Sequence, residues 1–305
     1  STSSSLLRGG TSGNGLRSPE KQRQQHRILQ RDHPCLLVRV EIEFEHIYQG
    51  SVAGGSIIDD AAFNEQQEDE VVCELLDDAD VEIAGGQLFV PIVGLEEGQL
   101  ENINSGETTL VADGAIFQDG AIQIPADAQV EFGSISDDDG EIDKRRKRRR
   151  LNGQTTGVKR VLAIRAVAND VATFGTTAQT AKNLFGTGAN DFTLASQYRK
   201  CSHEKLNFLP YQGTTSTGAL VSNGVVEVKV DGNIGESDRM NVQTQLLRSV
   251  TNLVGDLRSQ FDHVMICMPP GTTGSWIAYA YVKSWLSVYN DKWCQKLSTQ
   301  VHGKQ

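Results

Sequence analysis

Residues 262–305 read DHVMICMPPGTTGSWIAYAYVKSWLSVYNDKWCQKLSTQVHGKQ and form the densest apolar and aromatic run of this 305-residue chain. The run holds all three tryptophans and two of the five cysteines. DHVMICM is typical of a compact buried strand, PPGTTG of a turn and WIAYAYV of a further strand. We therefore expect the rest of the chain to be organised around these two strands.

The residues before this run, 159–261, alternate strand and helix patterns. VKRVLAIRAVAND predicts an apolar strand centred on residues 161–167, residues 176–186 predict a short helix, and DFTLASQYRKCS predicts a second helix. LNFLP and NGVVEVKVDG predict two more strands. One apolar face of a long helix is predicted by Val242, Leu246, Val250, Leu253 and Leu257. The expected fold class is α+β, a twisted mixed sheet with packed helices.

The first half of the chain has a different composition. Residues 1–34 are rich in Ser, Gly, Arg and Gln and are expected to be a disordered leader. The run CLLVRVEIEFEHIY alternates apolar with polar residues, as in a half-buried strand whose solvent face carries Glu41, Glu43 and Glu45. GGQLFVPIVGL, TTLVADGAIF and AIQIPADAQVEFG predict further strands. Residues 35–143 are therefore expected to form a small, acidic, mostly β module.

The net charge of −10 conceals a division along the chain. Residues 1–143 carry 7 Lys/Arg against 29 Asp/Glu, whereas residues 151–305 carry 15 against 10. Between them lies a tract of seven consecutive basic residues: Lys144, Arg145, Arg146, Lys147, Arg148, Arg149 and Arg150. The expected organisation is the acidic module, a basic linker over residues 144–158 and a C-terminal domain over residues 159–305.

The basic tract permits three interpretations. We favour a site for a processing protease, because nicking concentrates in exposed linkers. A solvated linker is the second interpretation, and a nuclear address or nucleic-acid patch is the third. Acidic and then polar flanks disfavour the third, so nucleic acid is not an expected partner. The sequence has no run of eighteen apolar residues, so a membrane is not an expected partner either.

Three segments in order carry a resemblance to a known family: VLAIRAVAND, QYRKCSHEKLNF and FDHVMICMPPGTTGSWIAYAYVKSWLSVYNDKWC. Together they resemble the gametolysin family of zinc metallopeptidases, most closely its diatom and algal members, over residues 159–302. The resemblance implies a metzincin-like domain, secreted as a zymogen, that acts as an endopeptidase on extracellular-matrix or cell-wall protein. It also implies that the acidic module is a pro-segment with the basic tract as its maturation site. Trp276, Tyr279, Tyr281 and Trp285 are expected to fill the core. By the resemblance, the WIAYAYV strand is alternatively the edge that pairs with an extended substrate.

The catalytic helix of this family carries His-Glu-x-x-His, because two His four residues apart lie on one helical face and hold Zn²⁺ while the Glu activates the bound water. By the resemblance, His302 is the first zinc ligand. Gly303 stands in the place of the Glu, and the second His would fall just beyond Gln305. As written, the chain is expected to be truncated within the motif and to bind no zinc. His203 and His263 stand alone, outside any standard zinc spacing, and are expected to be structural.

A separate hypothesis concerns the last three residues, 303–305. Gly303-Lys304 can be encoded GGT-AAG, which read as G|GTAAG is a splice donor behind the first base of a Glu codon. Residues 303–305 would then be translated intron, and the transcript would continue from His302 with Glu.

The five cysteines leave alternatives open. In a secreted protein, two of Cys201, Cys267 and Cys294 are expected to form a disulfide, without the sequence showing which two. Cys35 and Cys73 are expected to be buried or paired with each other. By the resemblance, one of them alternatively covers the zinc as an inhibitory thiolate.

Two further functions stand beside a secreted zinc metalloendopeptidase precursor. The alternative is a non-catalytic protease homologue that acts as a binding or inhibitory protein, because the catalytic Glu and the second and third His are absent from the sequence. The last is a nuclear protein addressed by KRRKRRR.

Overall fold

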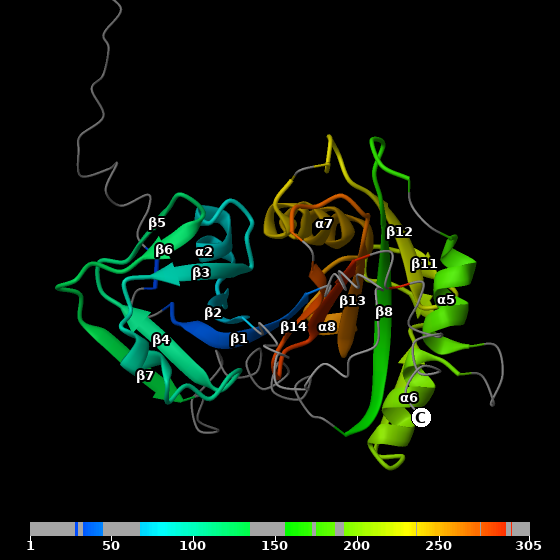
Figure 1. The fold of residues 1–305 in the computed structure, drawn as a ribbon, viewed down its shortest axis with the longest axis horizontal. Helices are drawn as coiled ribbons and strands as arrows, with labels where there is room; N and C mark the ends of the chain where they lie inside the picture. The colour runs from blue at the N-terminus through cyan, green and yellow to red at the C-terminus, as the bar shows by residue number, and fades with distance from the viewer. Residues whose placement is uncertain are drawn as a thin grey trace, which may run out of the picture.

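Strand β1 (Cys35–Phe44) runs from one half of the molecule into the other. The computed structural model describes residues 28–29, 33–44, 68–134, 156–172, 175–186, 192–235, 237–274, 276–290 and 294. Figure 1 shows two lobes side by side, with β1 passing between them. We call described residues 28–134 the acidic lobe and described residues 156–294 the C-terminal lobe. Most of the predicted leader, Glu45, the basic tract and residues 295–305 lie outside the described residues.

The C-terminal lobe contains neighbouring strands in the order β12-β8-β13-β15-β14. Their bounds are β8 Gly157–Val167, β12 Val225–Lys229, β13 His263–Met268, β14 Trp276–Tyr281 and β15 Leu286–Asn290. β12, β8, β13 and β15 run parallel, whereas β14 is antiparallel to β15. β9 (Leu206–Pro210) pairs with β8, and β10 (Gly213–Thr214) pairs with β11 (Leu220–Val221) in a separate small sheet. The predicted mixed sheet with packed helices is confirmed.

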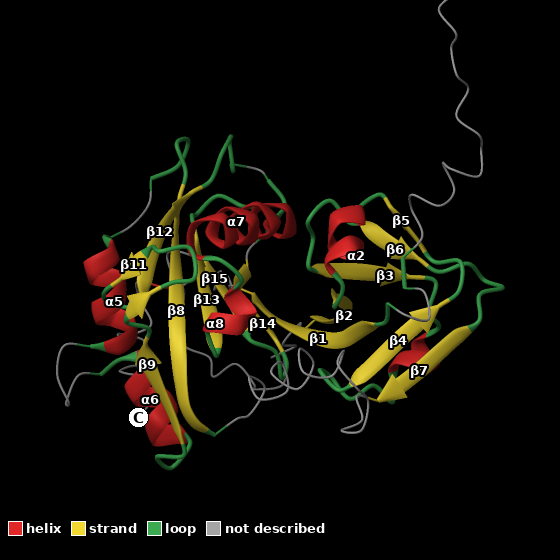
Figure 2. Cartoon of the chain, turned by 180° about the vertical axis from the view of Figure 1, so that it is seen from behind, coloured by secondary structure: helices red, strands yellow, loops and turns green. Residues whose placement is uncertain are grey.

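Helices cover both faces of this part of the sheet (Figure 2). α5 (Thr177–Phe185) and α6 (Leu194–Cys201) pack on one face, where Leu184 and Leu194 join a core cluster with Val161 of β8. α7 (Arg239–Val254) and α8 (Leu257–Gln260) lie on the other face, over the alternate residues of β8 and β13. Because both faces are covered, the β8 and β13 sequences are nearly continuous apolar runs. None of the helices in the described ranges has both the length and the apolar character needed to cross a membrane.

The long helix α7 follows the predicted pattern with one difference. Four of the five predicted positions are buried: Val242, Leu246 and Val250 in α7, and Leu257 at the start of α8. The prediction for Leu253 is wrong, since 43% of this residue is exposed and the neighbouring Val254 is buried instead. The helix ends there because Gly255 adopts a φ of +88°, which glycine tolerates best, and Leu257 begins α8.

The acidic lobe is mostly β, as its alternating sequence runs predict. Its elements after β1 are β2 (Glu68–Leu75), α2 (Asp78–Ile83), β3 (Phe89–Val93), α3 (Glu97–Leu100), β4 (Thr108–Ala112), β5 (Ile116–Gln118), β6 (Ala121–Gln123) and β7 (Val130–Ser134). β2 and the two short helices are absent from the sequence prediction. Glu41 and Glu43 of β1 are exposed, as predicted.

The two lobes share a hydrophobic core through β1. Four alternate β1 side chains lie in the same cluster as the buried side chains of α7, β13 and β14: Leu36, Val38, Val40 and Ile42. On the opposite face of the strand, Cys35 and Leu37 belong to the acidic lobe's own core. Because successive side chains of a strand point to opposite faces, β1 contributes to both cores. In the described residues, one thirteen-stranded sheet runs through both lobes.

Asp238→Ala tests the start of α7. The Asp238 carboxylate accepts the backbone N–H groups of Met240 (2.9 Å) and Asn241 (3.1 Å). Because alanine removes this acceptor, we expect the free energy of unfolding to fall by about 1 kcal/mol. Asp238→Asn keeps an acceptor and is expected to change it by about 0.3 kcal/mol. Urea denaturation followed by circular dichroism compares the two variants, and equal losses would contradict the capping role.

Candidate functional site

β14 is the strand for which the resemblance implies a substrate-binding edge. One edge of β14 pairs with β15, and the other pairs antiparallel with β1. In this register Val40 faces Tyr281, Ile42 faces Tyr279 and Phe44 faces Trp276, with an irregularity between Glu43 and Phe44. A strand edge offers a row of main-chain N–H and C=O groups to any extended segment. In the folded chain β1 occupies that row.

The two tyrosine side chains of β14 form hydrogen bonds with α7. The Gln243 side chain is 2% exposed, and its Oε1 accepts a hydrogen bond from the Tyr279 hydroxyl at 3.0 Å. Gln243 Nε2 donates to the Tyr281 hydroxyl at 2.9 Å. Burial raises the pKa of the Tyr279 and Tyr281 hydroxyls well above their ordinary value, so both stay protonated at neutral pH. These hydroxyls therefore fix β14 against α7 and are poorly suited to act as general bases.

A buried ion pair crosses from the acidic lobe to the C-terminal lobe. The Glu74 carboxylate on β2 is 3% exposed and accepts from Arg258 Nη1 of α8 at 3.3 Å. The same carboxylate oxygen accepts from the indole Nε1 of Trp285 at 3.2 Å. The Phe89 ring of β3 stacks on the Tyr281 ring with centroids 3.8 Å apart. One face of the acidic lobe's strands is thus matched in charge and shape to α8 and the β14–β15 segment.

Polar contacts continue between the lobes at the rim of this interface, formed by Val282 and Lys283 directly after β14 and by Arg39, Ser105 and Glu107 of the acidic lobe. The Ser105 hydroxyl donates to the Val282 carbonyl at 2.8 Å and accepts the Arg39 N–H at 2.9 Å. The Val282 N–H donates to the Arg39 carbonyl at 2.9 Å. Lys283 and Glu107 form an exposed ion pair at 3.2 Å. The rim fixes the register of the strand pair.

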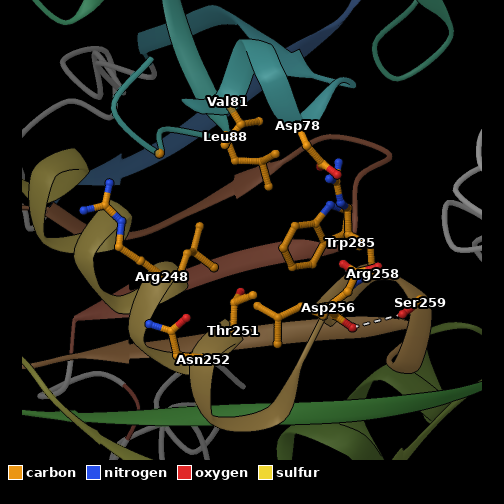
Figure 3. Close-up of a pocket in the computed structure, with 13 residues that line it drawn as sticks. Asp78, Val81, Leu88, Arg248, Thr251, Asn252, Asp256, Arg258, Ser259 and Trp285 are labelled. Carbon is orange, nitrogen blue, oxygen red and sulfur yellow. Dashed lines mark hydrogen bonds between the residues drawn. The ribbon is translucent and has the colours of Figure 1, made fainter. Parts of the chain in front are cut away.

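A pocket of about 630 Å³ lies between the lobes beside the ion pair (Figure 3). Asp78, Val81 and Leu88 approach it from the acidic lobe. The C-terminal side is lined by α7, α8 and Trp285, including Leu247, Arg248, Thr251, Asn252, Asp256, Leu257, Arg258 and Ser259. The described lining residues include neither His nor Cys, and their charges are mixed in sign. The pocket's described lining therefore presents no nucleophile paired with a histidine base.

The structure assigns the cysteine pairs that the sequence leaves open. Cys267 is bonded to Cys294, and Cys201 is an exposed free thiol. Cys35 is bonded to Cys73 and joins β1 to β2. Because both of these sulfurs are bonded, neither is a thiolate, and the alternative in which one of them covers the zinc is wrong.

His302, by the resemblance the first zinc ligand of an incomplete site, lies outside the described residues, as does the basic tract. Within the described ranges no group of three His, Cys, Asp or Glu side chains lies together as a metal site. His203 is exposed in the turn after α6. His263 is partly buried, stacks on the Phe208 ring and lies 2.9 Å from the Ser287 hydroxyl through Nε2. The contacts of His263 are those of a structural histidine.

Sequence reasoning missed several residues of this contact. Gln243 had a local signal, because it is a polar residue directly beside the apolar face of α7. Glu74 and Arg258 had none, since they are 184 residues apart and meet only through the fold.

Glu74 and Arg258 provide a test of the contact between the lobes. Glu74→Leu removes the carboxylate that faces the mostly buried guanidinium, so we expect the free energy of unfolding to fall by about 3 kcal/mol. Arg258→Met should cause a similar loss. The double variant should be more stable than the sum of the two losses implies, because neither charge is left behind. Additive losses in urea denaturation would show that the two side chains do not interact.

His263 makes the stability of the C-terminal lobe depend on pH. Burial, with a smaller effect from nearby Lys159, lowers the pKa of His263 from 6.5 to about 4. The folded state therefore favours the neutral ring, and this contribution is complete above pH 6.5 and is lost as the pH falls towards 4. His263→Gln should flatten the decline in free energy of unfolding between pH 7 and pH 4.5. His203→Gln, at an exposed position, serves as the control. An unchanged slope for His263→Gln would refute the prediction.

Comparison with models of known protein families, with curated proteins and with solved structures finds no match to this chain. Support for a function therefore comes from the sequence motifs and from the contacts between the lobes.

Proposed function

We propose that this chain is the precursor of a secreted zinc metalloendopeptidase that acts on extracellular-matrix or cell-wall protein, with the acidic lobe as its pro-segment. The observation that supports this most is the antiparallel pairing of β1 with β14. By the resemblance to metzincins, the β14 sequence is the edge that takes an extended substrate. In the folded chain, an extended strand of the acidic lobe lies along that edge.

The two sequence strings that carry the resemblance form neighbouring parts of the same sheet. DHVMICMPPG includes the central strand β13, and GSWIAYAYVKSW includes β14. β15 lies between these strands and pairs with both. The disulfides Cys35–Cys73 and Cys267–Cys294 support secretion, because disulfides persist in oxidising compartments.

Zinc would supply the hydrolytic chemistry by polarising the scissile carbonyl and lowering the pKa of a bound water. The described residues do not form a zinc site. His302 is the proposed first ligand, and the remaining ligands would follow it in the full product of the gene. The described residues have a different role. β14 offers main-chain N–H and C=O groups that would hold a peptide extended, and Gln243 holds β14 in place.

The basic tract at residues 144–150 is the proposed site of the processing protease. It lies between the described ends of the two lobes, after residue 134 and before residue 156. Cleavage there would separate the acidic lobe from the C-terminal lobe along the backbone. The protein substrate and this protease are the proposed partners.

The proposal is tested on the full product of the gene. Sequencing the cDNA across the codon for His302 shows whether Glu follows. The encoded protein is then measured for bound zinc, and for casein cleavage after the acidic lobe has been removed by proteolysis. We expect zinc binding and cleavage, both abolished by His302→Ala and both retained in the control His203→Ala. A zinc-free, inactive product would exclude the protease. A product of that kind that still binds a protease or an extended peptide would support the non-catalytic homologue.

A further inference from the structure

We infer that the acidic lobe stays bound to the C-terminal lobe after the chain between them is cut, so that processing yields a two-chain protein rather than a released pro-segment. The cut rests on the proposed function, whereas the association rests on the contacts between the lobes. The partner that fits the β14 edge and the α7–α8 face is then the chain's own acidic lobe.

No disulfide joins the two lobes. All five cysteines of the sequence lie in described residues, and the pairs Cys35–Cys73 and Cys267–Cys294 each lie within one lobe. Cys201 is a free thiol. A cut between residues 134 and 156 therefore leaves only non-covalent contacts between the pieces.

β1 cannot dissociate from β14 without the rest of the acidic lobe. β1 pairs with β14 along one edge and with β2 over residues 35–42 along the other. The Cys35–Cys73 disulfide adds a covalent link between β1 and β2. Release of β1 from β14 therefore requires the whole acidic lobe to move away.

Moving the lobe away would expose a hydrophobic core. Six buried side chains of the acidic lobe belong to the cluster shared with the C-terminal lobe: Leu36, Val38, Val40, Ile42, Val72 and Phe89. Their counterparts include Tyr281 and Trp285, which are 2% and 5% exposed. An interface that resembles a domain core cut in half is typical of permanent complexes.

Charge favours the same association. Residues 1–143 are strongly acidic, whereas residues 151–305 carry a small excess of basic residues. The Lys283–Glu107 pair at the rim is exposed and will weaken with salt. The Glu74–Arg258 pair is mostly buried and is screened much less. The association should therefore survive high salt.

Retention of the lobe also sets a condition for the proposed activity. As long as β1 lies on β14, an extended substrate cannot pair with the same edge. A cut in the basic tract would leave the edge filled, so a second event would be needed to clear it. Proteolysis within the acidic lobe is one event that would do this.

The test replaces residues 144–150 of the full chain with the recognition sequence of a site-specific protease. After complete cleavage, gel filtration is run at about 1 µM protein, a concentration at which a nanomolar dissociation constant keeps the pieces together. We expect both pieces in one peak at the elution volume of the uncut chain, with and without 1 M NaCl. They should separate in 6 M urea without reducing agent. Two separate native peaks would overturn the inference.

Two variants identify the contact responsible. Val40→Asp places a charge in the shared core and should shift the cut protein to two peaks, while Phe132→Asp alters an exposed side chain on β7 of the same lobe and should leave one peak. If Val40→Asp does not fold, the cut parent chain still decides the question. The readout requires neither zinc nor protease activity, so its failure and the failure of the proposed function are distinguishable.

Discussion

The antiparallel pairing of β1 with β14 is the constraint on which the rest of the structure depends. β1 has a strand on each edge, and its alternate side chains enter two different cores. A slip of one residue along β14 would turn Val38 and Val40 away from the shared core and place Arg39 and Glu41 in it. Burial therefore fixes the register, and the register in turn brings Glu74 to Arg258 and Phe89 to Tyr281.

The local elements that could be predicted from sequence are those with strong, uninterrupted patterns. β1, β8, β12, β13 and β14 have apolar or alternating runs, and α5, α6 and α7 have helical spacing with suitable ends. β2 was missed because its first residues are Glu68, Asp69 and Glu70, which resemble a solvated segment. β15 was missed because LSVYN is a short run directly after a turn, and periodicity over five residues is a weak signal.

The site was less accessible to sequence reasoning than the fold. The role of β14 as a binding edge could be proposed only from the family resemblance, and its occupation by β1 depends on residues about 240 positions apart. Three cysteines in one half of the chain allow three pairings, and only the fold selects Cys267 with Cys294. His302 and the basic tract stay predictions because they lie outside the described residues.

The distance along the chain between β1 and β14 has a consequence for synthesis on the ribosome. Once residue 134 is made, the acidic lobe has every strand of its own core, yet the β14 edge is complete only at residue 281. At a usual rate of 5–20 residues per second, roughly seven to thirty seconds pass between these two points. During that interval residues 40–44 of β1, which later pair with β14, present an unpaired edge, and the apolar side chains of the strand face the solvent. The early half of the nascent chain is therefore the half most in need of a chaperone.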